Sequence, residues 1–215
     1  MMKRILPLFL LLSLIVSACV APPKGRRPPS IRPAAENSDA SKRLCLADLD
    51  RLGARYSSIP DQNFGGGCST VGSVALATTP IPISSVKAIR CPLARALAVW
   101  LRDDAQPAAK RYFGSPIVKV ESYGAYACRN IIGGNTSLRS EHATANAVDI
   151  GGFVLRDGRR VMVKSGWQGD SNEQRFWRSV RAAGCQRFQT VLSPDYNAAH
   201  HDHLHFDMGR GPFCR

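Results

Sequence analysis

The stretch AHHDHLHFD, residues 199–207, holds four of the five histidines in this chain of 215 residues, and the fifth is His142. Its last part alternates polar and apolar side chains, which is the period of two that a β-strand requires. In such a strand His203, His205 and Asp207 point to one face, while the leucine and the phenylalanine between them point into the core. The stretch therefore predicts a short terminal strand with a histidine site on one side and core on the other.

The segments before this strand predict a mixture of helices and strands. One helix begins at Pro92, and its apolar stripe consists of Leu93, Leu97, Trp100 and Leu101. A second helix is capped by Ser171 with Gln174 and ends near Gly184. Further strands are predicted over residues 117–123, 147–155, 161–163 and 188–192. Because helices and strands do not alternate regularly, we expect an α+β fold with a small antiparallel sheet and flanking helices.

A second polar motif, SEHATANAVDI, lies at residues 140–150. His142 falls in the turn before the strand predicted at 147–155, and Asp149 falls near the start of that strand. A catalytic zinc ion takes three protein ligands from histidine and carboxylate side chains and leaves one position for water. One histidine of the terminal strand would complete such a set. Any single histidine could instead be structural, but the clustering of all five favours metal binding.

Two motifs carry a resemblance to a known family. SEHATANAVDIGGF at 140–153 and SPDYNAAHHDHLHFD at 193–207 resemble the bacterial extensin-like C-terminal domain family, over about Cys45 to Cys214. That family in turn resembles the LAS zinc peptidases, which include D-Ala-D-Ala carboxypeptidases and murein endopeptidases and share H-x(6)-D followed by H-x-H. The resemblance implies an LAS-like fold and a peptidoglycan substrate.

The resemblance also implies roles for five side chains. His142, Asp149 and His205 match the three zinc ligands. His203 matches the catalytic histidine, which would act as general base, and His200 matches a further active-site histidine that would stabilise the oxyanion. The chain departs from the carboxypeptidase branch, because the glutamate of E-x-x-W-H is absent, and it fits the endopeptidase pattern H-x-x-H-x-H.

Positive charge indicates the kind of partner. The formal net charge is +13 at pH 7, which favours anionic partners such as cell-wall polymers and lipid headgroups. Arg129 falls where the resembling peptidases place an arginine for a substrate carboxylate, and Arg139 competes for that role. A plain surface-charge explanation stays open for both arginines.

The N-terminus predicts export. Residues 1–18 form a signal peptide with two early positive charges, an apolar run and small residues before Cys19. The sequence VSAC resembles a lipobox, so Cys19 is the expected lipidation site, although an ordinary cleaved signal remains the alternative. Residues 19–43 are basic and rich in proline, which predicts a tether, and the domain is expected over 44–215. We expect periplasmic location with a lipid anchor in the membrane, favouring the outer one, and this argues against nucleic acid as a partner.

Cysteine usage agrees with an oxidising compartment. Without Cys19 the number of cysteines is even, and no C-x-x-C pair is present. An even set in an exported protein predicts disulfides, and the sequence leaves their pairing open. The six cysteines are Cys45, Cys68, Cys91, Cys128, Cys185 and Cys214.

Three functional classes follow from these patterns. The first is a zinc-dependent hydrolase that cuts peptide bonds of peptidoglycan stems or cross-links. The second is a non-catalytic peptidoglycan-binding or scaffold lipoprotein that retains the metal site. The third is a periplasmic zinc carrier, against which the lack of long histidine-rich tracts argues. The sequence leaves the scissile bond and the oligomeric state open.

Overall fold

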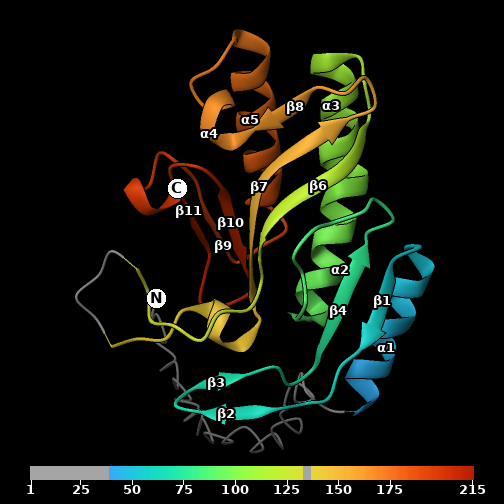
Figure 1. Cartoon of the computed structure of the whole chain (residues 1–215), viewed down its shortest axis with the longest axis vertical. Helices are drawn as coiled ribbons and strands as arrows, with labels where there is room; N and C mark the ends of the chain where they lie inside the picture. The colour runs from blue at the N-terminus through green and yellow to red at the C-terminus, as the bar shows by residue number, and fades with distance from the viewer. Residues whose placement is uncertain (1–38, 133–136) are drawn as a thin grey trace, which may run out of the picture. The chain divides into compact units, whose positions relative to one another are not determined.

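The computed structural model describes residues 39–132 and 137–215 (Figure 1). The expected signal peptide and the lipidation site at Cys19 lie outside these residues. The first element is helix α1, Asp39–Arg51, which begins five residues before the expected start of the domain at residue 44. Leu49 is its buried anchor against the rest of the fold. The last residues assigned to the tether from their composition are therefore helical.

A sheet of six strands forms the centre of the fold. Its strands lie in the order β11-β9-β10-β7-β6, and β8 pairs with β7. All pairings are antiparallel except that of β11 with β9. The strands are β6 (Ile117–Gly124), β7 (Ala147–Leu155), β8 (Arg160–Met162), β9 (Thr190–Leu192), β10 (Leu204–Asp207) and β11 (Phe213–Cys214). The predicted strands over 117–123 and 147–155 and the terminal strand are confirmed, whereas the one predicted over 188–192 is shorter and the short β11 was not predicted.

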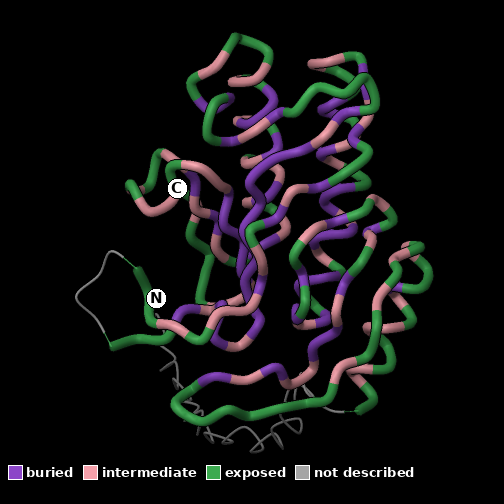
Figure 2. Tube along the Cα trace, viewed as in Figure 1, coloured by how far each residue is buried: buried purple, intermediate pink, exposed green. Residues whose placement is uncertain are grey.

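Strand β7 is buried along almost its whole length, as Figure 2 shows for the centre of the fold. Its register against β6 skips a residue, because Ser122 pairs with Ile150 whereas Glu121 pairs with Gly152. The extra residue is Gly151, so the strand contains a β-bulge, which reverses the side that each later residue faces. Without the bulge, Asp149 and Phe153 would lie on the same face of the sheet. With it, Asp149 faces the polar side and Phe153 faces the core.

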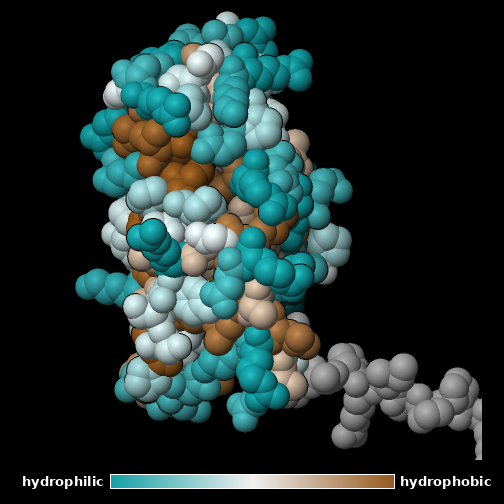
Figure 3. All heavy atoms as spheres, turned by 90° about the vertical axis from the view of Figure 1, so that its right-hand side faces the viewer, coloured by the Kyte–Doolittle hydropathy of each residue, from teal (hydrophilic) through white to brown (hydrophobic). Residues whose placement is uncertain are grey.

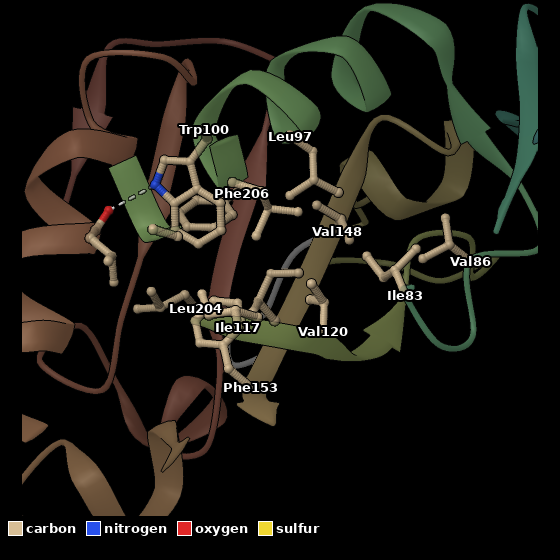
Figure 4. Packing of buried hydrophobic residues seen from close by; sticks show 14 of the residues in the cluster. Ile83, Val86, Leu97, Trp100, Ile117, Val120, Val148, Phe153, Leu204 and Phe206 are labelled. Carbon is tan, nitrogen blue, oxygen red and sulfur yellow. Dashed lines mark hydrogen bonds between the residues drawn. The ribbon is translucent and has the colours of Figure 1, made fainter. Parts of the chain in front are cut away.

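The core lies between this sheet and the helices α2 (Cys91–Trp100), α3 (Gln106–Phe113) and α5 (Ser171–Gly184). A π-helical turn, Leu101–Ala105, joins α2 to α3. The apolar stripe predicted for the helix that begins at Pro92 lies on α2 and the turn after it, and it is buried as expected. At the centre, the Trp100 ring packs against Phe206 at 4.8 Å, and its N–H donates to the Val180 carbonyl of α5 at 3.0 Å (Figure 4). The apolar side of β10 is thus fixed by aromatic packing, at roughly 1.5–3 kcal/mol for each fully buried large side chain.

Helix α5 starts differently from the prediction. Its N-cap is Asp170, whose carboxylate accepts hydrogen bonds from the backbone N–H groups of Asn172 and Glu173 at 2.7 and 3.0 Å. Ser171, which was predicted to cap the helix, is its first residue instead. An ionised carboxylate at this position also interacts favourably with the helix dipole, so aspartate is the stronger cap here. The strand predicted over 161–163 is β8, which forms a hairpin with β7, but Val163 already belongs to the short helix α4, Val163–Gly166.

Smaller sheets complete the fold. A three-stranded sheet has the order β1-β4-β5, with β1 at Arg55–Ser58, β4 at Ser73–Thr78 and β5 at Ile89–Arg90. A two-stranded sheet joins β2 (Asn63–Gly65) to β3 (Cys68–Ser69). The face that carries α1 and α3 is largely polar, with smaller apolar areas between the charged side chains (Figure 3).

Three disulfides fasten the elements together: Cys45–Cys91, Cys68–Cys128 and Cys185–Cys214. The first joins α1 to α2, the second joins β3 to the segment after β6, and the third joins the end of α5 to β11. The fold is therefore α+β with antiparallel sheets, helices and disulfides, as the sequence predicts. Within the described residues, no helix has the length and apolar character needed to cross a membrane.

Candidate metal centre

Three buried side chains meet on the polar side of the central sheet. His205 on β10 and Asp149 on β7 are direct cross-strand partners, so the antiparallel register places their side chains side by side. His142 comes from the short 3₁₀ helix Glu141–Thr144, which precedes β7 and whose N-terminus is capped by the Ser140 hydroxyl. Their exposed fractions are at most 9 %. The fold thus brings together the three residues that the sequence pattern predicts as metal ligands.

Their ligand atoms converge on one point. His142 Nε2 lies 3.1 Å from Asp149 Oδ2 and 3.2 Å from His205 Nδ1, and His205 Nδ1 lies 2.9 Å from Asp149 Oδ1. All of these atoms lie within 4.8 Å of one another. Donor atoms of a single metal ion, bound at about 2.0–2.2 Å, are separated by about 3.3–3.6 Å in tetrahedral geometry, so a small outward shift of these side chains would admit the ion.

The outer nitrogens of the two histidines decide their tautomers. His142 Nδ1 donates to the carbonyl of Ala125 at 3.1 Å, and His205 Nε2 donates to the Asp207 carboxylate at 3.0 Å. Each neutral ring then presents a lone pair on its inner nitrogen. Two lone pairs and a carboxylate face one another in a buried space, and such an arrangement requires a positive charge at its centre. This group can hold a metal ion, and the outer partners are those that orient metal-binding histidines.

A proton can serve as that positive charge in the metal-free protein. Burial disfavours a charged imidazole, but hydrogen bonds to Asp149 and Asp207 outweigh it and raise the pKa of His205 to about 9. Burial likewise opposes ionisation of Asp149, yet its contacts with His142 and His205 hold its pKa well below the usual range. Metal binding would therefore displace a proton from His205.

His203 lies beside this group, in the residue just before β10. Its Nδ1 is 2.9 Å from the Asp202 carboxylate, and its Nε2 is 3.5 Å from Asp149 Oδ1. The Tyr123 ring contacts the His203 ring edge-on, with centroids 5.9 Å apart. Asp202 fixes the proton on Nδ1, so Nε2 carries a lone pair directed toward the ligand group, which is the orientation that a general base needs.

His200 packs against both His203 and His205, at the end of the 3₁₀ helix Ala198–His200. The two rings are 5.1 Å apart, and His200 Nδ1 is 2.7 Å from Asn197 Oδ1. Burial, together with the nearby His203 and His205, lowers the pKa of His200 to about 4, so the ring is neutral at pH 7. Oxyanion stabilisation by His200 requires the proton on Nε2, and hence an Asn197 amide turned to donate to Nδ1.

A cleft of about 660 Å³ opens onto these histidines. Its floor includes His200, His203, His205 and Asp207. The other lining residues come from two parts of the chain, which we call its two walls. The first wall consists of Arg129, Ile131, Ile132 and residues 138–141, and the second consists of Thr190, Leu192, Tyr196, Asn197, Ala199, Arg210 and Phe213. The cleft is large enough for a peptide segment, and it reaches the candidate metal centre at His205.

The two predicted substrate arginines both line this cleft, but their surroundings differ. Arg139 donates to the carbonyl of Gly66 at 2.5 Å and to the Asn130 side chain at 2.8 Å. It packs against the turn at residues 65–67, where all three glycines have positive φ and added Cβ atoms at 66 and 67 would press on the arginine. Among the described residues, the Arg129 side chain has a single hydrogen bond, to the neighbouring Asn130 carbonyl at 3.4 Å. Arg129 is therefore the better placed of the two to bind a ligand, because Arg139 is already engaged in holding the fold.

Several site residues escape sequence reasoning. Asp207 and Asp202, which orient the histidines, had no assigned role, although Asp207 shares the period of two with His205. The Ala125 carbonyl has no sequence signal at all. Tyr123 falls in the strand predicted over 117–123, but no feature of the sequence indicates its contact with His203. Trp167 does not line the cleft, because it is 3 % exposed and donates to Asp195.

Comparison with known proteins gives one positive result. A family model described as "Extensin-like protein C-terminus" matches residues 43–215. No curated protein and no solved structure matches the chain. The match covers all described residues from Arg43 onward, including both motifs and the whole candidate metal centre. The chain belongs to the extensin-like protein C-terminus family.

Proposed function

We propose that this chain is a zinc-dependent hydrolase with an LAS-peptidase-like fold, which cuts peptide bonds of peptidoglycan stems or cross-links. The observation that carries the proposal is the convergence of His142 Nε2, His205 Nδ1 and the Asp149 carboxylate, with both outer ring nitrogens tied to acceptors. Two imidazoles and one carboxylate form a ligand set typical of catalytic zinc.

A zinc ion held by these residues would polarise the scissile carbonyl and lower the pKa of its bound water toward ~7. The chain's own side chains account for the remaining requirements. His203, oriented by Asp202, holds its Nε2 lone pair beside the ligand group and can accept a proton from water there. The same nitrogen can then return the proton to the leaving amine.

A peptide substrate is supported by the cleft and by the charge. The cleft runs past the histidines and is lined by exposed apolar side chains as well as arginines, which suits a polypeptide better than a small polar metabolite. The choice of peptidoglycan rests on the resemblance to LAS peptidases and on the formal net charge of +13, which favours the anionic cell wall. We further propose that the chain is an exported lipoprotein anchored through Cys19, with the periplasm as its location and the outer membrane as the favoured anchor site.

The first experiment measures metal content. The chain, made in an oxidising compartment and purified, should contain about one zinc per molecule, whereas His142→Ala and His205→Ala should lose most of it. His201→Ala is a matched control, because His201 is exposed and lies outside the ligand group. A folded wild-type chain without zinc after metal supplementation would contradict the proposal.

The second experiment separates hydrolysis from binding. Purified peptidoglycan and its soluble muropeptides are incubated with the wild-type chain and with His203→Ala, and the products are separated by mass. New peptide termini from wild type but not from the variant, with zinc content equal in both, support the hydrolase.

A scaffold that retains the metal is the second candidate. It is favoured by the lack of the carboxypeptidase glutamate and by the fact that the carboxylates lining the cleft are already engaged. Asp207 is bound to His205 and Gly209, and Glu141 accepts from Asn146 at 2.7 Å. Wall binding without product in the second experiment would support this alternative.

A further inference from the structure

Exposed apolar side chains concentrate at the cleft. Among the described residues, nine large apolar side chains are exposed, and five of them line the cleft, with exposed fractions between 42 and 62 %. Ile131, Ile132 and Leu138 lie on one wall, and Tyr196 and Phe213 lie on the other. An apolar surface of this kind beside a polar floor is typical of a ligand-binding groove.

The wall with Tyr196 and Phe213 is held in place by the chain around it. The two rings meet edge-on at 5.7 Å, and Tyr196 also contacts His200 at 5.6 Å. The Phe213 N–H donates to the carbonyl of Gln189 at 2.8 Å, and the adjacent Cys214 is bonded to Cys185. The aromatic pair is therefore a fixed surface that leads directly to the histidines, and a ligand can pack on it with little loss of side-chain entropy.

Arg210 lies on the same wall, and its positive charge is available to a ligand. The turn that carries it is tied on both sides, because the Gly209 N–H donates to Asp207 Oδ1 at 2.8 Å and Thr190 Oγ1 donates to the Arg210 carbonyl at 3.3 Å. Its side chain is exposed and lines the cleft. In the part of the chain that the structure describes, no carboxylate lies within ion-pair distance of its guanidinium. The backbone is thus ordered and the cation is available.

The other charges of the cleft leave its balance positive. Arg129 and Arg139 line the other wall. The three arginines outnumber the two carboxylates of the cleft, Asp207 and Glu141, and each carboxylate already accepts a hydrogen bond, from His205 and from Asn146. A ligand that enters the cleft therefore meets cations on both walls and needs negative charge to match them.

We propose that the cleft selects acidic peptides, with Arg210 pairing with a ligand carboxylate while Tyr196 and Phe213 hold an adjacent apolar group. This inference rests on the proposed function for the nature of the ligand as a peptide, and it adds the substrate class and a specificity-determining residue. The selection is a property of binding, so it does not depend on turnover.

The test measures binding to the full chain by fluorescence anisotropy. The probes are a fluorescein-labelled stem tetrapeptide with free carboxylates and the same peptide with every carboxylate converted to an amide. The acidic peptide should bind about 3- to 10-fold more tightly, and the preference should shrink in high salt. Arg210→Gln should remove most of this preference. Arg175→Gln is the matched control, because it removes the same charge from an exposed arginine of α5 outside the cleft.

A second variant tests the apolar half independently. Phe213→Ala should weaken both peptides by a similar factor, about 3-fold, and leave the ratio between them unchanged. Equal affinity of the wild type for the two peptides, an unchanged preference in Arg210→Gln, or no binding of either peptide would overturn the inference. Charge-selective binding without cleavage of the peptide would contradict the hydrolase instead, so the two proposals fail in different experiments.

Discussion

Asp207→Asn is a sharp perturbation of the metal centre because it changes one atom and spares the ligands. In the structure the two carboxylate oxygens of Asp207 accept from two different donors, the Nε2–H of His205 at 3.0 Å and the N–H of Gly209 at 2.8 Å. Asparagine offers only one acceptor oxygen, so its amide N–H₂ must face one of these donors. The substitution therefore breaks one hydrogen bond and weakens the orientation of the His205 ring.

The expected magnitude is a 10- to 100-fold loss of zinc affinity, which corresponds to about 1.4–2.7 kcal/mol. Competition with a chromophoric chelator at pH 7 measures it directly. The ligand variant Asp149→Asn should lose more, because it removes the negative charge that faces both histidines.

The control for this prediction is Asp157→Asn. Asp157 is also a carboxylate that accepts from a backbone N–H and from a side chain, both of Arg159, but it lies in the exposed hairpin after β7. Its substitution should leave zinc affinity unchanged. If Asp207→Asn binds zinc as tightly as the wild type while Asp149→Asn does not, the inferred tautomer of His205 is wrong.

Three further predictions concern the surroundings of the site. In the metal-free protein the raised pKa of His205 stabilises the fold by an amount of order 3 kcal/mol, which is fully present below pH 6.5 and should be lost as the pH rises through about 9. Urea unfolding at several pH values, with and without zinc, measures this contribution, and zinc should remove the pH dependence. Gly151→Ala should lower turnover more than zinc affinity, because a Cβ at this position would lie 2.5–2.8 Å from the phenol of Tyr123 and push that side chain away from His203, the general base. An equal loss of turnover and zinc affinity would contradict this prediction. Replacing Cys68 and Cys128 together by alanine should weaken zinc binding more than replacing Cys45 and Cys91 does, since the segment before Cys128 supplies the Ala125 carbonyl that orients His142. Chelator competition on the two double variants measures the difference in zinc affinity.

Local patterns predict the elements that carry the site. The alternation in residues 203–207 and the apolar run at 147–155 predict β10 and β7, and the pairing of these strands sets His205 opposite Asp149. These features follow from the strand period, which depends only on near neighbours in the chain. The family match over residues 43–215 agrees with the same motifs.

Other features depend on which segments meet in space. The sequence alone determined the strand alternation, the clustering of histidines and the even number of cysteines in the domain. Only the tertiary structure decided the disulfide pairing, the bulge at Gly151, the carbonyl of Ala125 on His142 and the engagement of Arg139 by Gly66. Backbone carbonyls are present at every residue and so carry no sequence signal, and their direction is set by the packing of the whole chain. The sequence therefore determines which side chains can bind a metal ion, whereas the fold determines how these side chains are oriented.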